Sequence, residues 1–313
     1  MRTVQFSEYG PPGVLRIVEV PRPHAGPGEI RVAVRASSVS PGEVKGRSGA
    51  MREVMPAVFP VRTGHEAAGV VDEVGEGVPG VHVGDEVFGA TASTGRGANA
   101  DHAVLTTWAP KPAAWTWEEA SGALGAVETS FRVLDRLGVA SGHTVLVQGA
   151  AGGTGSVAVQ LALVRGATVI GTASEHNHGF LRSLGAEPTT YGPGLVERVR
   201  ALAPSGVDAV FDCAGGALPD LVAVAVDADP ARVVTVADLS AAAHGVHLSI
   251  ASPVAALGAA DPPALYGLAL AVELAEQGRL RIPLAGTFPL AEVAAAHALS
   301  ESGHARGKIA LRH

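Results

Sequence analysis

A cluster of small residues between two apolar runs has the spacing of a phosphate-binding turn. Ala150, Gly152 and Gly155 match the dinucleotide-binding pattern G-x-G-x-x-G, with alanine at the first position. Glycine lets a backbone approach a ligand closely, and a helix N-terminus presents unpaired N–H groups and partial positive charge. We therefore expect this turn, together with Gly153 and Thr154, to bind a pyrophosphate. Gly152 would make room for the ligand and Gly155 would let the helix pack on the strand; a plain structural turn is the alternative.

The end of the next apolar strand bears on which dinucleotide would bind. NAD sites usually place an acidic residue there to hold the ribose 2′-OH, whereas this strand is followed by Ser174. Ser174 can donate a hydrogen bond to a 2′-phosphate, and His176 or His178 can add positive charge. Tyr191, after the following strand, can stack on the cofactor or donate to it. Glu175 favours the opposite choice, because a carboxylate repels a phosphate. The pattern predicts NADPH rather than NADH, with ordinary polar loop residues as the alternative.

Strands and helices alternate on both sides of this turn. Continuous apolar strands separated by amphipathic helices are typical of a parallel, doubly wound sheet of the Rossmann type. The expected strands cover 144–147, 168–171, 207–212 and 232–236, and the expected helices 156–163 and 178–184.

The rest of the chain has a different pattern. Residues 1 to about 110 contain short period-two strands, at 30–35 and 69–74, divided by Gly/Pro turns, which predicts a partly open, β-rich barrel. The overall prediction is an α/β protein with two domains. Further helices are expected at 117–124, 127–137, 263–277 and 288–297, and a last strand at 307–311.

Composition limits the classes of partner. The 313 residues are 47% hydrophobic and 17% charged, which is typical of a globular protein. A net charge of −7 without a basic run argues against nucleic acid or an anionic membrane as partner. Because no apolar segment reaches the ~20 residues that span a bilayer, and no signal peptide is evident, we expect a cytoplasmic protein. The single cysteine, Cys213, excludes an internal disulfide and a multi-cysteine metal site.

Segments along essentially the whole chain resemble the zinc-independent (zeta-crystallin-like) quinone oxidoreductases of the medium-chain dehydrogenase/reductase superfamily. The resemblance implies a GroES-like catalytic domain over 1–113, completed by 281–313, and a Rossmann NADPH-binding domain over 114–280, with the active cleft between them. It also implies hydride transfer from NADPH to a small quinone or an activated C=C (enone), in a homodimer. The matching segments are 1–15, 34–41, 64–69, 80–89, 145–156, 180–186 and 302–309.

The resemblance assigns roles to individual residues. Thr129 matches the family's threonine near the nicotinamide, Thr235 lies in the backbone that passes the carboxamide, and Lys308 matches a lysine close to the cleft. His65 matches a zinc ligand of the related alcohol dehydrogenases. Ser40, however, stands where those enzymes carry their first cysteine, and catalytic zinc needs about three protein ligands, so we expect no metal.

The sequence departs from the family where a proton donor is expected. Quinone reductases usually carry asparagine at the position of Ser40 and a tyrosine near Lys45, and neither is present. Ser40 and Lys45 are therefore the candidate donors, with Glu43 as a further ionisable group. A buried lysine can have a lowered pKa and supply a proton. The alternative is that Glu43 and Lys45 are solvated loop residues.

Two further departures concern the substrate. Asn99 replaces an aromatic residue common in the family, and Glu128 and Arg132 flank Thr129 on one expected helix. These residues suggest a pocket shaped for one polar substrate, such as a specialised biosynthetic enone. Arg132 as a mere surface partner is the alternative, since an exposed helical pair is worth only ~0.2–0.5 kcal/mol.

The expected activity is NADPH-dependent reduction of a quinone or enone, with a backbone N–H, Ser40 or Lys45 stabilising the developing oxyanion. One alternative is a trans-acting enoyl reductase that acts on a carrier- or CoA-linked thioester. Another is a protein that binds NADPH and serves a regulatory, non-catalytic role.

Overall fold

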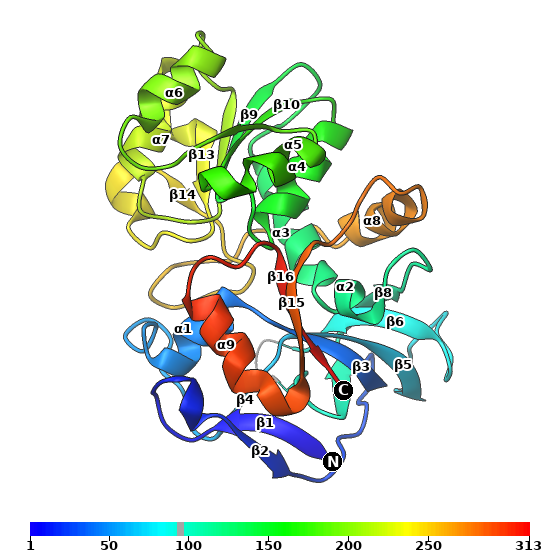
Figure 1. Cartoon of the computed structure of the whole chain (residues 1–313). Coiled ribbons are helices and arrows are strands. Elements are labelled where there is room, and N and C mark those ends of the chain that lie inside the picture. The colour runs from blue at the N-terminus through cyan, green and yellow to red at the C-terminus, as the bar shows by residue number, and fades with distance from the viewer. Residues whose placement is uncertain (93–96) are drawn as a thin grey trace. The chain divides into compact units, whose positions relative to one another are not determined.

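The computed structural model describes residues 1–92 and 97–313 (Figure 1). The chain divides into two compact units, residues 1–125 with 268–313 and residues 126–267. The first unit is β-rich and the second contains a parallel sheet with helices between its strands. The predicted class, α/β with a β-rich domain and a doubly wound parallel sheet, is confirmed.

The unit boundaries fall within helices α3 (Ala123–Arg136) and α8 (Gly267–Glu276). Helix α2 (Trp117–Ser121) belongs to the β-rich unit because it packs on strands of that unit. The segment before α2 is tied to residue 280, since the Trp115 indole N–H donates to the Leu280 carbonyl at 3.2 Å. Domain boundaries at 113/114 and 280/281 stay a prediction.

The β-rich unit is built on two sheets in the described residues. A seven-stranded sheet has the order β15-β16-β3-β5-β6-β8, with β7 pairing with β3, and a three-stranded sheet has the order β2-β1-β4. Register shifts between β3 and β5 mark bulges, which bend a sheet toward a barrel. The strands are β1 (Arg2–Phe6), β2 (Arg16–Glu19), β3 (Ile30–Val39), β4 (Val61–Arg62), β5 (Glu66–Val74), β6 (Glu86–Ala90), β7 (His102–Leu105), β8 (Thr107–Pro110), β15 (Leu284–Pro289) and β16 (Lys308–Arg312).

The C-terminal helix begins later than predicted. Phe288 and Pro289, expected in a helix over 288–297, end strand β15, where Phe288 lies opposite Leu311 of β16. Helix α9 (Val293–Glu301) starts only after a short 3-10 turn. Phe288 also packs against the apolar core of the β-rich unit, so sheet pairing and packing override the helical spacing.

The second unit has a six-stranded parallel sheet of order β11-β10-β9-β12-β13-β14 in the described residues. The strand order reverses at β9, and in open sheets ligands bind at the carboxyl ends of the strands at such a reversal. Its strands are β9 (Thr144–Gln148), β10 (Thr168–Thr172), β11 (Glu187–Thr189), β12 (Ala209–Asp212), β13 (Val233–Thr235) and β14 (His247–Leu248), and its other helices are α4 (Gly155–Val164), α5 (His178–Ser183), α6 (Leu195–Leu202) and α7 (Leu218–Val224).

Burial explains the continuous apolar strands of this sheet. Val145, Leu146 and Val147 of β9 are fully buried, as expected for a strand covered on both faces.

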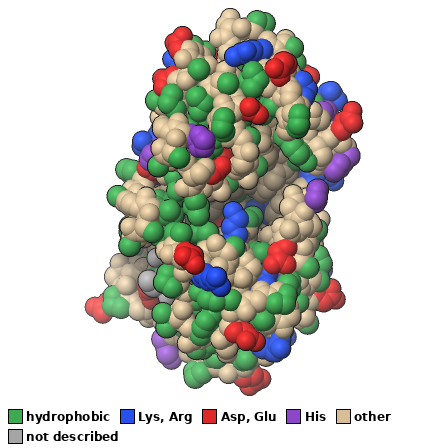
Figure 2. Space-filling view, turned by 90° about the vertical axis from the view of Figure 1, so that its left-hand side faces the viewer, with side chains coloured by type: hydrophobic (Ala, Val, Ile, Leu, Met, Phe, Trp, Pro, Cys, Tyr) green, Lys and Arg blue, Asp and Glu red, His purple; other side chains and the backbone are tan. Residues whose placement is uncertain are grey.

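The surface is mixed in charge, because side chains of both signs lie scattered over the face drawn in Figure 2. In the part of the chain that the structure describes, no helix combines the length and apolar character needed to cross a membrane.

Candidate functional site

The small-residue turn joins the carboxyl end of β9 to the N-terminus of α4. A Cβ at Gly155 would lie 2.3 Å from the Gly149 carbonyl oxygen, so only glycine allows α4 to approach β9 this closely. A Cβ at Gly152 would meet one described atom within 4 Å besides its chain neighbours, the same oxygen at 3.3 Å. The backbone at Gly152 is therefore open to a ligand, whereas Gly155 is required for packing.

Hydrogen bonds to β10 hold this turn in place. The Gly149 N–H donates to Thr172 Oγ1 at 3.0 Å, and the Ala150 N–H donates to the Thr172 carbonyl at 3.0 Å. Thr154 is the N-cap residue of α4 but makes no side-chain cap hydrogen bond. The helix N-terminus is thus not capped by this side chain, which suits an anionic group.

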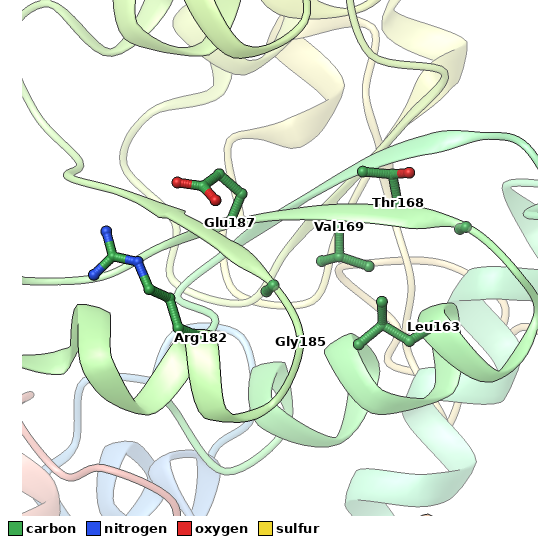
Figure 3. A pocket seen from close by; sticks show the side chains of 8 residues that line it. Leu163, Thr168, Val169, Arg182, Gly185 and Glu187 are labelled. Carbon is green, nitrogen blue, oxygen red and sulfur yellow. The ribbon is translucent and has the colours of Figure 1, made fainter.

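A pocket of about 460 Å³ in the same unit lies elsewhere (Figure 3). It includes Thr168 and Glu187, the first residues of β10 and β11, so it opens at the amino ends of these parallel strands. Nucleotides bind at the carboxyl ends of such sheets. We therefore do not place the cofactor in this pocket, which is lined by Leu163, Ala167, Thr168, Val169, Arg182, Gly185, Ala186 and Glu187.

Ser174 and His178 lie on one turn after the carboxyl end of β10. The Ser174 hydroxyl accepts from Asn177 Nδ2 at 3.2 Å and lies 3.4 Å from His176 Nε2. His178 is half-buried, and its Nε2 atom has no hydrogen-bond partner among the described residues. Tyr191 follows β11 and is exposed. Ser174 and His178, two of the predicted 2′-phosphate ligands, therefore share one turn, but the Nε2 atom of His178 is buried.

Thr235 ends β13, and its side chain holds a turn. The Thr235 hydroxyl donates to Asp212 Oδ2 at 2.7 Å and accepts the N–H groups of Ala237 and Asp238 at 3.1 Å.

The single cysteine, Cys213, follows Asp212 directly. Burial, and to a lesser extent the Asp212 carboxylate, raises the pKa of the Cys213 thiol well above its ordinary value, so this cysteine is not an activated nucleophile.

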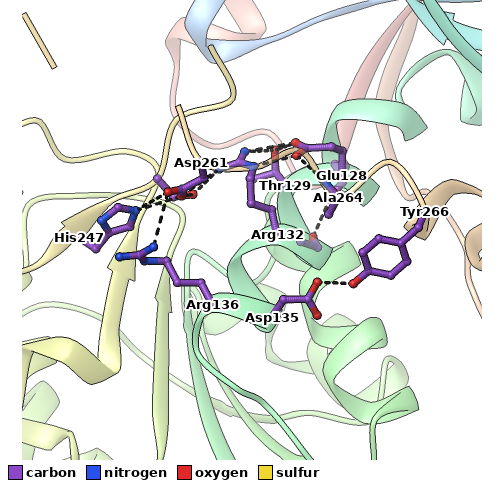
Figure 4. Close-up of polar contacts among 12 residues, drawn as sticks. Glu128, Thr129, Arg132, Asp135, Arg136, His247, Asp261, Ala264 and Tyr266 are labelled. Carbon is purple, nitrogen blue, oxygen red and sulfur yellow. Dashed lines mark hydrogen bonds and ion pairs between the residues drawn. The ribbon is translucent and has the colours of Figure 1, made fainter. Parts of the chain in front are cut away.

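Thr129 sits beside a buried ion pair on α3. Arg132 and Glu128 are each only 5% exposed, and Arg132 Nε donates to Glu128 Oε1 at 2.8 Å (Figure 4). Arg132 Nη2 also donates to Thr129 Oγ1 at 3.3 Å. The surface-partner alternative for Arg132 is therefore wrong. Helical spacing placed the pair together, but it did not show that the surrounding elements cover this part of α3.

The candidate donors in the β-rich unit lie on helix α1 (Pro41–Ser48) and just before it. Ser40 is the N-cap residue, and its Oγ accepts the Glu43 N–H at 3.3 Å. Lys45 is exposed, although the role predicted for it required burial. A hydroxyl that accepts at a cap keeps its own proton for donation, so Ser40 remains able to act as a donor.

Glu43 is buried within a network that links distant segments. Its Oε1 atom accepts the Gly64 N–H and Asn99 Nδ2, each at 3.0 Å, and lies 3.5 Å from His297 Nε2. Asn99 Nδ2 also donates to Thr63 Oγ1 at 2.9 Å. The description of Glu43 as a solvated loop residue is therefore wrong.

The pKa of Glu43 reflects competing causes. Burial alone would raise this pKa. The interactions with His297, then with His65 and the Gly64 N–H, lower it by more than burial raises it, so the pKa of Glu43 lies below its ordinary value.

Lys308 forms a second buried pair that the sequence did not reveal. Its Nζ lies 3.7 Å from Glu66 Oε1, and both side chains are buried. A Cβ at Gly122 would lie 2.7 Å from Lys308 Cε, and one at Gly125 would lie 2.6 Å from Glu66 Oε1. The two glycines thus make room for the pair. Glu66 directly follows His65 in the matched segment 64–69. Its place in that segment could have marked it as a candidate site residue, although nothing in the sequence pairs it with Lys308.

Among the described residues, no group of three or more histidine, cysteine, aspartate or glutamate side chains has an arrangement that could hold a metal ion. The absence of zinc stays a prediction.

Comparisons with known proteins define the class. A family model described as "Alcohol dehydrogenase GroES-like domain" matches residues 26–139, and one described as "Zinc-binding dehydrogenase" matches residues 184–311. The chain is thus a medium-chain dehydrogenase/reductase with a GroES-like part and a Rossmann-type sheet. A chloroplast envelope quinone oxidoreductase homolog of Arabidopsis thaliana is 30% identical over 322 residues, covering 99% of this chain and 97% of that protein. The chain belongs to the zinc-independent quinone oxidoreductase family.

Other relatives match over shorter stretches. The synaptic vesicle membrane protein VAT-1 homolog of Rattus norvegicus is 37% identical over 198 residues, which cover 62% of this chain and 48% of that protein. The spectinabilin polyketide synthase system protein NorB of Streptomyces orinoci is 37% identical over 202 residues, which cover 62% of this chain and 9% of NorB. The matched part is therefore about half of the vesicle protein and a small part of the synthase.

Solved structures agree over the full length. The quinone oxidoreductase from Coxiella burnetii superposes with a TM-score of 0.83 at 28% identity, covering 100% of this chain and 99% of that one. A mycobacterial protein solved in complex with NADPH has a TM-score of 0.82 at 27% identity, with 100% of both chains covered.

Proposed function

We propose that this protein is an NADPH-dependent oxidoreductase that transfers a hydride to a small quinone or to the activated C=C of an enone. The observation that carries the proposal is the turn after β9, where Gly152 leaves the backbone open at an uncapped helix N-terminus. Relatives named as quinone oxidoreductases and a structural neighbour solved with NADPH support it. The pyrophosphate would be held by Ala150, Gly152, Gly153, Thr154 and Gly155.

The preference for NADPH rests on the turn after β10. Ser174 and His178 would hold the 2′-phosphate, since both lie on the turn that follows the carboxyl end of β10. Tyr191, exposed after β11, would lie against the same part of the cofactor. Replacing Ser174 by aspartate would then repel the phosphate and accept the ribose 2′-OH of NADH.

The residues that act on the substrate would do so by orientation and charge stabilisation, because the nicotinamide supplies the hydride when it is bound. Thr129 and the backbone at Thr235 would orient the nicotinamide, and Lys308 would lie close to it. Ser40 would donate a hydrogen bond to the developing enolate or hydroquinone oxygen. Lys45 is the weaker candidate, since it is exposed.

Calorimetry with NADPH and NADH tests the proposal. Wild-type protein should bind NADPH more tightly, Ser174→Asp should reverse the preference, and Gly152→Ala should weaken NADPH binding by about tenfold or more with an unchanged melting temperature. Gly13→Ala is the matched control, because a Cβ there would meet no described atom within 4 Å. Absence of heat with either nucleotide would refute the oxidoreductase proposal. Unchanged binding by Gly152→Ala would show that the turn is not the site.

A second candidate is a trans-acting enoyl-thioester reductase, which the similarity to part of NorB favours. Steady-state rates with quinones, enones and CoA thioesters separate the two, because the thioester reductase should turn over crotonyl-CoA-type substrates fastest. A third candidate is a protein that binds NADPH without catalysis. Tight NADPH binding without turnover of any acceptor would support that one.

We also propose a homodimer in the cytoplasm. Strand β14 lies at the edge of the parallel sheet, and an edge strand can pair with its copy in a second chain. Sedimentation equilibrium measures the mass directly, and a monomer at micromolar concentration would contradict the dimer.

A further inference from the structure

The guanidinium of Arg132 is fully engaged by groups of its own unit. Nε and Nη2 donate to the two carboxylate oxygens of Glu128, at 2.8 and 3.2 Å, in a bidentate pair. Nη2 also donates to Thr129 Oγ1 at 3.3 Å, and Nη1 donates to Ser249 Oγ. The Thr129 hydroxyl in turn donates to Glu128 Oε2 at 3.4 Å. Because every guanidinium nitrogen has a partner, this side chain is built to hold protein groups rather than to bind a ligand.

Arg132, Glu128, Thr129, Ser249 and Asp261 form a cluster that ties two other segments to α3 (Figure 4). Ser249 Oγ donates to Asp261 Oδ2 at 2.5 Å, and His247 Nε2 lies 3.0 Å from both Asp261 oxygens. Arg136 Nη1 lies 3.6 Å from Asp261 Oδ1. The Ala264 N–H donates to Glu128 Oε1 at 3.3 Å. The end of β14 and the segment 261–264 are thereby fastened to the helix that carries Thr129.

The cluster lies at the carboxyl edge of the parallel sheet, where ligands bind in open α/β sheets. The Ser249 N–H donates to the Thr235 carbonyl at 2.8 Å, so Ser249 is joined to the carboxyl end of β13. Arg132 therefore contacts Thr129 directly and reaches the backbone at Thr235 through Ser249. These are the two groups that the proposed function places beside the nicotinamide.

We propose that Arg132 is a positioning residue, whose guanidinium fixes the Thr129 hydroxyl and the Thr235–Ser249 backbone relative to each other for hydride transfer. The inference rests on the proposed function. Lysine keeps the charge but lacks the planar fork, so it cannot hold Glu128, Thr129 and Ser249 at once. Misplacing reacting groups by about 1 Å can reduce a rate on the order of a hundredfold, so small displacements matter here.

Two measurements test this assignment on Arg132→Lys and Ser249→Ala, with Asp135→Asn as the control. Asp135 lies on the same helix, but its side chain is 41% exposed and its partners are Tyr266 and Arg165, outside the cluster. Ser249→Ala removes the two contacts of one hydroxyl, to Arg132 and to Asp261, without leaving a charge unpaired. The first measurement is amide hydrogen exchange over 249–264 without nucleotide. Exchange should rise about tenfold in both variants and stay unchanged in Asp135→Asn.

The second measurement is the single-turnover rate of NADPH oxidation by a benzoquinone, with its deuterium isotope effect. Arg132→Lys should lower the rate about tenfold or more with NADPH affinity changed less than about threefold. Thr129→Val should also lower it, and the double variant should lose less than the two single losses combined, because Arg132 acts in part through the Thr129 hydroxyl. If Arg132 had only a structural role, the rate losses of Arg132→Lys and Thr129→Val would be additive and proportional to the loss of stability. The deuterium isotope effect would then equal that of the wild type.

Wild-type rate and exchange in Arg132→Lys would overturn the inference, as would additive losses with Thr129→Val. If wild-type protein bound no pyridine nucleotide, the proposed function would fail separately. The exchange measurement needs no cofactor, and unchanged exchange over 249–264 in both variants would then refute the positioning role.

Discussion

Two buried glutamates, Glu128 in the parallel-sheet unit and Glu43 in the β-rich unit, contact different kinds of partner. Glu128 faces the Arg132 guanidinium in a bidentate pair, whereas Glu43 faces the His297 imidazole at 3.5 Å and accepts neutral N–H donors. The nitrogens of Arg132 each have a partner. In the described residues, Glu43 Oε2 and both ring nitrogens of His297 have no hydrogen bond. At 3.5 Å, the distance between Glu43 Oε1 and His297 Nε2 is too long for a good hydrogen bond.

The two partners predict different responses when the charge of the glutamate is removed from the Glu128–Arg132 network or from the Glu43 network. A guanidinium cannot release its proton in a protein, so a change at Glu128 leaves a buried cation. Glu43 has no guanidinium partner, so replacing it leaves no permanent cation behind, and its own carboxyl group can take up a proton at low pH. We therefore expect the first network to be rigid and the second to depend on pH.

The largest effect is expected from Glu128→Gln. The amide would leave Arg132 with Asp261 as its nearest carboxylate, at 3.8 Å, and breaking a buried pair typically costs about 3–5 kcal/mol. The free energy of unfolding in urea measures it, with Asp135→Asn as the exposed control. A loss below about 1 kcal/mol would show that the pair is not held as the distances indicate.

Glu43→Gln should cost less, about 1–3 kcal/mol by the same measurement. The amide oxygen can still accept the Gly64 N–H, and the change leaves no guanidinium without its carboxylate. Glu53→Gln is the matched control, because the Glu53 side chain is 86% exposed and its replacement should change stability by less than about 0.5 kcal/mol. If Glu43→Gln cost as much as Glu128→Gln, the contrast between the two networks would disappear.

The pH dependence of stability should distinguish the same two networks. The folded pKa of Glu43 lies below its ordinary value of 4.5, so below pH 4.5 the unfolded state binds more protons at this site. The stability that Glu43 contributes is present above pH 4.5 and is lost as the pH falls through the folded pKa. Urea midpoints measured on both sides of pH 4.5 should therefore fall less steeply in Glu43→Gln than in wild type. Parallel curves would show that Glu43 does not titrate in this way.

The smallest effect is expected from Tyr266→Phe, at most about 0.5–1 kcal/mol. The Tyr266 phenol donates to Asp135 at the surface, while its ring packs edge-on against Phe131 with centroids 5.7 Å apart. Phenylalanine keeps the ring contact and loses only an exposed hydrogen bond. A loss comparable to that of Glu128→Gln, seen in the urea midpoint, would show that this surface pair belongs to the buried cluster.

Local features of this protein were predictable from the sequence. The strand, turn and helix around residues 145–164 were predicted because their determinants are close in the chain: Gly155 meets the carbonyl of Gly149, six positions away. The order of strands and helices in the parallel sheet followed from hydrophobic periodicity for the same reason. The boundary at Phe288 was wrong, because pairing with β16 decided it and periodicity alone does not report pairing.

The sequence by itself determined the family, the class of fold and the turn at which a dinucleotide would bind. Only the tertiary structure decided which charged residues are buried and which groups they hold. Arg132 meets Ser249 across 117 positions and Asn99 meets Glu43 across 56. Neither type nor spacing shows burial at such separations. A charged side chain becomes part of a site when distant elements exclude water around it, and that exclusion is a property of packing.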